Sequence, residues 1–317
     1  MFSKATWKKL THFYSWKCLV KITKIEKYGN VWVPNDLCSE CTFFRELMAQ
    51  IVIHLVRRDR LFNKMKVNQA LIMAGGRGTR LGMGTKSYIL YNGRVLLDYV
   101  VESCMVAGIK NIVVFLPSKD IEANLDKEKV DKVHALIKKY PNIKWVQYPK
   151  ELGLGFRGAP NEVKKYLGKK KPFFLLCGQS PQSASFLNKL GSLYKPNSIV
   201  LSGYKYRYEF FASIGEVKAN RIVNFTNIET IKPRGFRVKN NEFITHMPYV
   251  WNFEYYDKIM KRDSLKSWVE FYPLDFIKEG GECYLAENPI SVSEVDYKND
   301  LPNLFKSIDI LVKNNYL

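Results

Sequence analysis

A cluster of glycines that directly follows an apolar stretch is the part of this sequence best suited to chemistry. Val67–Met73 is short and largely apolar, which predicts a buried strand, and Gly75, Gly76 and Gly78 follow it. Glycines at the end of a strand let the chain turn sharply and leave its amides open to a ligand. Successive amides in such a turn form a partly positive concavity that suits phosphate. The sequence therefore predicts a phosphate-binding loop after the first strand.

Three basic residues add positive charge to this loop. Arg77 and Arg80 lie within it, and Lys86 follows six residues after Arg80. An arginine can bind two phosphate oxygens at once, whereas a lysine supplies a compact, mobile charge. The loop is not a Walker motif, because no G-K-S/T follows the glycines, and it is not G-x-G-x-x-G, because Leu81 takes the place of the third glycine.

The segment resembles the signature of the sugar-phosphate nucleotidylyltransferases, which make nucleotide sugars and related activated alcohols. Residues 75–80 match their G-G-x-G-T-R, and Lys86 matches a lysine that usually follows a proline, here Thr85. A glycine turn of some other α/β protein remains the alternative, although such a turn needs neither Thr79-Arg80 nor a spaced lysine. The resemblance implies that Arg80 and Lys86 are catalytic, and that the nucleotide is bound by Ala74, Gly75, Gly76, Arg77, Gly78 and Thr79.

Later segments resemble further motifs of the same family. Gly155 and Gly158 stand where G-T-x-G-A usually cradles the base, and Gln147 resembles the glutamine that often contacts the base. Lys232 stands in I-K-P, which resembles the E-K-P motif whose lysine meets the acceptor phosphate. The resemblance therefore implies that Gln147, Gly155 and Gly158 bind nucleotide and that Lys232 binds the acceptor.

The metal-binding part of the family pattern is altered. The family usually has G-D at the end of a strand where this chain has Gly178-Gln179, and that aspartate binds Mg²⁺ with a carboxylate that corresponds here to Glu294 or Asp296. The resemblance thus implies Mg²⁺ as cofactor, with Glu294 and Asp296 as its ligands and Gln179 beside the nucleotide. A neutral amide oxygen is a weaker ligand for a hard dication, so either the nucleotide phosphates help to hold Mg²⁺ or the site is impaired.

The order of apolar stretches indicates how these residues are positioned. A strand, a helix at 95–107 ended by Gly108 and a strand at 112–116 form a βαβ unit, which implies a parallel sheet. With the resemblance, the expected fold class is α/β: a Rossmann-like mixed, mostly parallel sheet flanked by helices, of the nucleotide-diphospho-sugar transferase type. Further strands are expected at 144–148, 172–177, 199–204, 212–217, 221–225, 243–252, 283–285 and 290–295, and further helices at 121–140, 161–167, 253–260, 268–279 and 300–314.

The chain divides into an extension and a domain in this interpretation. Residues 1–64 form a basic, mostly helical N-terminal extension of unknown role, and residues 65–317 form a nucleotidyltransferase-like domain with a nucleotide side (65–180) and an acceptor side (181–317). Residues 42–61 show an apolar helical stripe closed by arginines. This stripe predicts a helix that packs on the domain or a partner, or one that makes peripheral contact with an anionic membrane.

Composition narrows the classes of function. The 317 residues carry a net charge of +20, which favours anionic partners, although a solvated basic surface would give the same value. No apolar run reaches about 18 residues, so no membrane-spanning helix is expected. Six scattered cysteines fit a reducing compartment and hence a cytoplasmic protein. No nucleic-acid-binding module is recognisable, so a nucleic-acid partner is not expected.

Three functions remain at this level. The first is a nucleotidyltransferase that uses Mg²⁺ to transfer NMP from a nucleoside triphosphate to a sugar 1-phosphate or related acceptor, with release of pyrophosphate, for nucleotide-sugar synthesis. The second is a catalytically impaired relative that binds a nucleotide or nucleotide sugar and regulates. The third is a basic protein whose residues 1–64 contact nucleic acid or membrane.

Overall fold

The chain forms two compact units, Met1–Lys64 and Met65–Leu317. The computed structural model describes residues 25–28, 31–34, 67–78, 81–148, 163, 165–168, 171–205, 212–228, 238–252, 276–290 and 298–314. In the first unit the described residues form an antiparallel pair of strands, β1 (Ile25–Tyr28) and β2 (Val31–Pro34). The extension was expected to be mostly helical; its described residues lie in these two strands, and for the rest of the extension that expectation stays a prediction. The helix expected at 42–61 lies outside the described residues.

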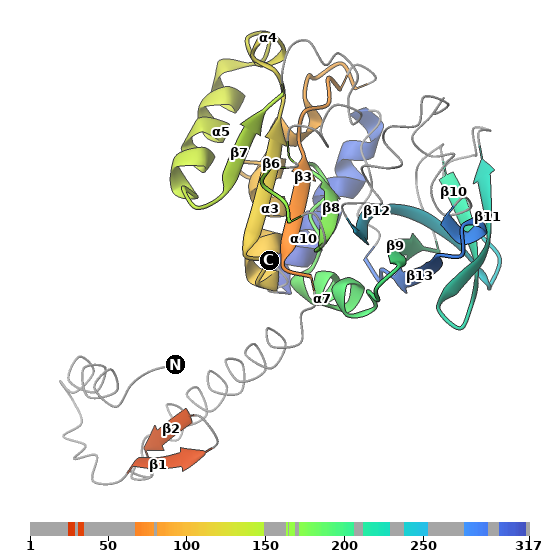
Figure 1. Ribbon diagram of the computed structural model, residues 1–317. Coiled ribbons are helices and arrows are strands. Elements are labelled where there is room, and N and C mark those ends of the chain that lie inside the picture. The colour runs from red at the N-terminus through yellow and green to blue at the C-terminus, as the bar shows by residue number, and fades with distance from the viewer. Residues whose placement is uncertain are drawn as a thin grey trace. The chain divides into compact units, whose positions relative to one another are not determined.

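The described residues of the second unit form a nine-stranded sheet in the order β10-β11-β13-β9-β12-β8-β3-β6-β7 (Figure 1). The half of the sheet that comes first in the chain is parallel: β3 lies between β6 and β8, and β7 lies beside β6. These four strands are β3 (Gln69–Met73), β6 (Asn111–Leu116), β7 (Lys144–Gln147) and β8 (Pro172–Cys177). Every residue of β3 is buried, as expected for a central parallel strand covered on both faces.

Successive side chains of the parallel strands point to opposite faces of the sheet, and three helices pack on one of these faces. Side chains of α3 (Leu96–Ala107), α5 (Lys127–Lys139) and α7 (Ala184–Ser192) join one apolar cluster with Ala70, Ile72 and Val114 of the sheet. The alternate side chains, such as Leu71 and Met73, join a second cluster on the other face. The predicted βαβ unit is therefore confirmed, and α3 ends at Gly108 in the left-handed conformation expected of a helix-ending glycine.

The C-terminal helix α10 (Leu301–Lys313) returns to the first half of the unit and lies beside α3 (Figure 1). It packs on a small hairpin of β4 (Leu90–Tyr91) and β5 (Arg94–Val95), where the Tyr91 ring stacks on Phe305 and the Tyr91 hydroxyl donates to Asp309 at 2.7 Å. A short η5 turn (Lys298–Asp300) precedes it.

The second half of the sheet is antiparallel in most of its pairings. β12 pairs with β8, β9 and β10, β10 pairs with β11, and β11 meets β13, which runs parallel to β9, so five strands close into a small ring. These strands are β9 (Ser198–Tyr204), β10 (Ala212–Lys218), β11 (Arg221–Ile228), β12 (Glu242–Asn252) and β13 (Glu282–Glu287). The prediction of a mixed sheet is confirmed, whereas "mostly parallel" applies only to the first half.

Two expected elements differ from the structure. The helix expected at 121–140 is two helices, α4 (Lys119–Glu122) and α5, because Asp126 begins α5 as an N-cap that accepts from the Glu128 amide. The strand expected at 283–285 is β13, which extends from Glu282 to Glu287. Of the separate strand expected at 290–295, Ile290 is not in a strand, and residues 291–295 lie outside the described part.

One helix, α7, was missed. Ser183 caps it by accepting from the Phe186 amide, and Phe186, Leu187 and Leu190 bury one face. Gly191 inside the segment argues against a helix on propensity alone. A side chain at that position would come within 3.0 Å of the Phe174 ring, so close packing on the sheet accounts for the glycine.

The helices that the structure describes include none long and apolar enough to cross a bilayer.

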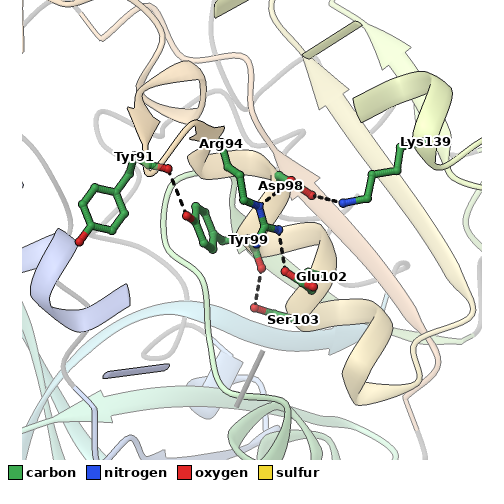
Figure 2. A network of polar contacts seen from close by, with 7 residues as sticks. All are labelled: Tyr91, Arg94, Asp98, Tyr99, Glu102, Ser103 and Lys139. Atoms are coloured by element: carbon green, nitrogen blue, oxygen red, sulfur yellow. Dashed lines mark hydrogen bonds and ion pairs between the residues drawn. The ribbon is translucent and has the colours of Figure 1, made fainter. Parts of the chain in front are cut away.

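A charged network fastens α3 to its neighbours (Figure 2). Arg94 donates to Asp98 at 2.8 Å and to Glu102 at 2.6 Å, while Lys139 of α5 reaches Asp98 at 3.4 Å. The Asp98 side chain is only 11% exposed, so its carboxylate depends on these two cations. The network joins the β4–β5 hairpin, α3 and α5.

Arg94→Ala is expected to lower the free energy of unfolding by about 1–3 kcal/mol, because the nearly buried Asp98 carboxylate loses its shortest charged hydrogen bond. Urea denaturation measures the change. Lys132→Ala, on the exposed face of α5, is the control and should stay within about 0.5 kcal/mol of the parent protein. Equal stability of the two variants would contradict this role for the network.

Candidate active site

The glycine loop, residues 74–78, leaves β3 at the carboxyl end of the parallel strands. The Ala74 amide still donates to the Phe115 carbonyl of β6 at 2.8 Å, so the chain keeps its pairing for one residue beyond β3. A Cβ at Gly75 would lie 3.2 Å from the Leu116 carbonyl oxygen, which shows how tightly the loop passes over the end of β6. Gly76 and Arg77 are exposed. Ligands of open α/β sheets bind beyond this end of the strands.

Gly78 and Gly84 hold the conformation of the segment. Gly78 has φ +60°, and a Cβ there would lie 1.9 Å from the Gly84 carbonyl oxygen. The Gly78 carbonyl accepts the Leu81 amide at 3.0 Å and the Gly82 amide at 3.2 Å, which forms a turn. Gly84 has φ +79°, and its missing side chain leaves room for Leu125 beyond α4. Any side chain at Gly78 would force apart the two loop segments that contain Gly78 and Gly84.

Lys86 lies beside the glycine loop because the chain turns back. It begins the short 3₁₀ helix η2 (Lys86–Tyr88), and its Cγ lies 3.6 Å from the position of a Cβ on Gly78. The next residue, Ser87, is buried and donates through Oγ to the Ala74 carbonyl at 2.8 Å. The predicted phosphate loop and the predicted lysine are therefore neighbours in space.

The end of β8 also packs against the glycine loop. A Cβ at Gly178 would lie 3.0 Å from Cα of Ala74 and 3.1 Å from Cβ of Ser87, so the chain at Gly178 passes directly against the loop. Gln179 follows and is 8% exposed. The chain at Gly178, which directly precedes Gln179, is therefore next to the glycine loop.

Buried amides connect the segment after β8 with the segment after β13. Gln182 donates to the Ser180 carbonyl at 3.2 Å, and Asn288 donates to Oε1 of Gln182 at 2.7 Å. The Oδ1 of Asn288 in turn accepts the Ile290 amide at 3.1 Å. This chain of hydrogen bonds fixes the segment that leads toward residues 291–297 next to the one that carries Gln179.

A second polar group surrounds Glu122, near the end of β7. The Tyr88 hydroxyl donates to Oε1 of Glu122 at 3.0 Å, and Nε2 of Gln147 donates to Oε2 at 3.0 Å. The Glu122 side chain is 15% exposed, and Nε2 of His134 lies 3.8 Å from its Oε1. Burial, and then the charge of Glu122 and the hydrogen bond to it, raise the pKa of the Tyr88 hydroxyl far above its ordinary value. Tyr88 is therefore a neutral donor.

The structure brings a subset of the expected site residues together. Ala74, Gly75, Gly76, Arg77 and Gly78 form the loop, Lys86 and Gln179 border it, and Gln147 lies two strands away at the same edge. The other expected site residues lie outside the described residues: Thr79, Arg80, Gly155, Gly158, Lys232, Glu294 and Asp296. Their roles stay predictions.

The described residues do not form the expected metal site. Among the described residues no group of three or more His, Cys, Asp or Glu side chains is placed to hold a metal ion. Gln179 offers a neutral amide, a poor donor for Mg²⁺. Both carboxylates expected to bind the metal lie outside the described residues.

The sequence alone did not point to four residues at this edge: Gly84, Ser87, Tyr88 and Glu122. Gly84 could have been found, since a glycine six residues after Gly78 suggests a second special backbone position. Glu122 gives no signal of its own, because it stands in a charged helical stretch where most carboxylates are solvated.

A family model supports the resemblance carried by the glycine loop. Residues 70–142 match the MobA-like NTP transferase domain. A 43-residue stretch is 51% identical to the adenosylcobinamide-phosphate guanylyltransferase of Methanocaldococcus jannaschii and covers 14% of this chain. The match spans only 22% of that relative's length. The predicted resemblance to nucleotidyltransferases is confirmed.

Solved structures support the fold over a longer range. The inositol-1-phosphate CTP transferase from T. maritima superposes with a TM-score of 0.54 at 22% identity, covering 77% of this chain and 97% of that structure. A nucleotidyl transferase from Methanothermobacter superposes with a TM-score of 0.50 at 13% identity, covering 78% of this chain and 98% of that one. At these identities the likeness establishes a common fold.

Gly78→Ala is expected to lower the free energy of unfolding by at least about 2 kcal/mol, because the new Cβ combines a left-handed backbone with a collision against a backbone carbonyl. Gly76→Ala is the matched control: nothing lies within 4 Å of its added Cβ, and its φ is not left-handed. It should change stability by no more than about 0.5 kcal/mol. Two variants of equal stability in chemical denaturation would contradict the described loop.

Proposed function

We propose that this chain, whose residues 70–142 match the MobA-like NTP transferase domain, is a nucleotidyltransferase. It transfers NMP from a nucleoside triphosphate to a sugar 1-phosphate or a related phosphorylated acceptor and releases pyrophosphate. The observation that carries the proposal is the packing of Lys86 against Gly78. A lysine beside a tight loop of exposed amides is a site for several phosphates at once.

The proposed reaction does not require the protein to form a covalent bond with its substrates. A phosphate oxygen of the acceptor attacks the α-phosphorus in line, its new P–O bond forms, and the bond from the α-phosphorus to the pyrophosphate oxygen breaks. The attacking phosphate is already ionised, so no general base is needed. Catalysis then consists of positioning the two substrates and neutralising the charge that spreads over the phosphoryl oxygens.

Different residues are assigned to the phosphates and to the base of the nucleotide. We assign residues 74–79 to the phosphates, Arg80 to the leaving pyrophosphate, and Lys86 to the α-phosphoryl group in the transition state. Gln147, Gly155 and Gly158 meet the base and Gln179 borders the nucleotide. Residues 65–180 thus form the nucleotide side of the domain.

The acceptor belongs to residues 181–317 in this proposal, with Lys232 on its phosphate. The acceptor of the T. maritima relative, inositol 1-phosphate by its name, supports a phosphorylated polyol or sugar. A role in the supply of nucleotide-sugar precursors would follow. Glu294 and Asp296 would hold Mg²⁺, which in such reactions polarises the α-phosphate. The hydrogen bond between Gln182 and Asn288 joins the segments that follow β8 and β13.

A binding protein without turnover is the second candidate, and Gln179 is the observation that favours it. A neutral side chain stands where a metal-binding carboxylate is expected, and it is 8% exposed at the end of β8. Such a protein would still bind nucleotide on the glycine loop. In that case the proposed fold and nucleotide site hold, and only the chemical step is lost.

Pyrophosphate release tests the enzyme directly. The purified protein with Mg²⁺ is screened with CTP, GTP, ATP and UTP against sugar 1-phosphates, inositol 1-phosphate and choline phosphate. Lys86→Ala is expected to lower kcat by about 100-fold or more, because a preorganised charge at the reacting phosphate is removed.

Lys110→Ala is the matched control for this experiment. Lys110 is exposed and precedes β6, at the end of the sheet opposite the glycine loop, so its loss should leave kcat unchanged. Release that survives in Lys86→Ala would contradict the assigned role. No release with any pair, together with a nucleotide-dependent rise in melting temperature, would support the binding protein instead.

A further inference from the structure

We propose that Glu122 and Tyr88 are positioning residues that fix the Gln147 amide with its carbonyl oxygen toward the nucleobase. The site then prefers a base that carries an exocyclic amino group over one that carries a keto group at the same position. This inference rests on the proposed function, because it takes a nucleotide to be bound on the glycine loop with its base near the end of β7.

The orientation of the amide follows from the chemistry of its partner. Gln147 approaches Oε2 of Glu122 at 3.0 Å, and an ionised carboxylate can only accept hydrogen bonds. The amide nitrogen must therefore face Glu122, and Oε1 of Gln147 must face away from it. A glutamine without such a partner can turn over and exchange the two ends.

Glu122 is itself held in place. Its other oxygen accepts the Tyr88 hydroxyl at 3.0 Å, and Tyr88 is fully buried in the cluster beneath α3 and α5. The Glu122 amide donates to the Ser118 carbonyl at 3.0 Å, and Leu125, three residues on, fills the space left by Gly84. The carboxylate is thus anchored from η2, α4 and the glycine segment.

The position of Gln147 suits a nucleobase. It pairs in register with Leu116, whose carbonyl oxygen lies against Gly75, and β7 is two strands from β3. Two strand spacings are about 10 Å, which is the order of distance that separates a base from the phosphates of its own nucleotide. Gln147 is half-buried, so part of its amide is accessible to a ligand.

The fixed amide distinguishes the two pyrimidines. Cytosine presents an amino donor where uracil presents a keto acceptor. A glutamine free to turn over pairs with either, because it offers a donor or an acceptor as needed. With its nitrogen bound to Glu122, Gln147 offers an acceptor with both lone pairs free. The negative charge of Glu122 behind the amide also favours the amino group over a keto oxygen.

The same arrangement couples base recognition to the lysine. Tyr88 stands two residues after Lys86 in the single turn of η2. A base that donates a hydrogen bond to Oε1 of Gln147 therefore stabilises the hydrogen bonds of Glu122 with Gln147 and Tyr88. Because Tyr88 belongs to η2, the same base also stabilises the turn that carries Lys86. Discrimination is expected in binding and not only in turnover.

Nucleotide binding by titration calorimetry tests the inference, with two pairs in which an amino group is replaced by a keto group at the same position: CTP against UTP, and GTP against XTP. In the pair that the protein binds, the amino-bearing nucleotide should bind at least about tenfold tighter, in the range of one good base contact. Glu122→Gln should reduce this ratio below about threefold, because a neutral amide partner lets Gln147 turn over. Glu122→Asp should retain part of it.

Glu128→Gln is the matched control, since it makes the same change on exposed surface of α5 and should leave the ratio intact. Melting temperatures within about 2 °C of the parent protein confirm that the variants are folded. If nucleotides bind but the parent protein shows no preference, or Glu122→Gln keeps it, the inference is wrong and the proposed function stands. If no nucleotide binds, both are wrong.

Discussion

The close approach of backbone to backbone at the carboxyl ends of β3, β6 and β8 is the constraint on which the rest of this site depends. The chain at Gly78 passes so near the Gly84 carbonyl that no side chain fits between them, and the chain at Gly178 passes close to Ala74, though less closely. Such contacts leave amides uncovered at one edge of the sheet, where anions are favoured. They also determine what surrounds the loop, because Lys86 and Ser87 can reach Gly78 and Ala74 only when no side chain intervenes.

Three arrangements in the second unit follow from this constraint. The short η2 turn carries Lys86 and Tyr88 on one rigid element, so the phosphate end and the Glu122 group share a support. The Arg94 network and α10 then hold α3 and the β4–β5 hairpin behind that turn. On the other side, buried amides from Gln182 to Asn288 join the parallel half to the small ring of strands. The site is therefore supported by the sheet itself and by packing on both faces.

The sequence predicted the parallel half well and the rest less well, for physical reasons. Continuous apolar runs such as 70–73 in β3 and 112–116 in β6 are readily recognised, because a strand buried on both faces is apolar over most of its length. The closure of β10, β11, β13, β9 and β12 depends on long-range pairing that no local pattern reveals. α7 was missed because Gly191 opposes a helix locally while its packing on Phe174 is a tertiary contact. Within the site, glycines and Lys86 were recognisable from type and spacing, whereas Glu122 acquires its place only through Tyr88 and Gln147.

Amide hydrogen exchange with and without nucleotide tests the central claim most directly, because that claim is that backbone amides of the glycine loop bind phosphate. Exchange is followed by mass spectrometry on peptides that cover residues 74–78 and 84–88, with the nucleoside triphosphate at a concentration that saturates the protein by calorimetry. The account predicts strong protection of residues 74–78 and weaker protection of the η2 turn, with little change in β11 and α10. Saturating nucleotide that leaves residues 74–78 unprotected would contradict it and place the nucleotide elsewhere on the protein.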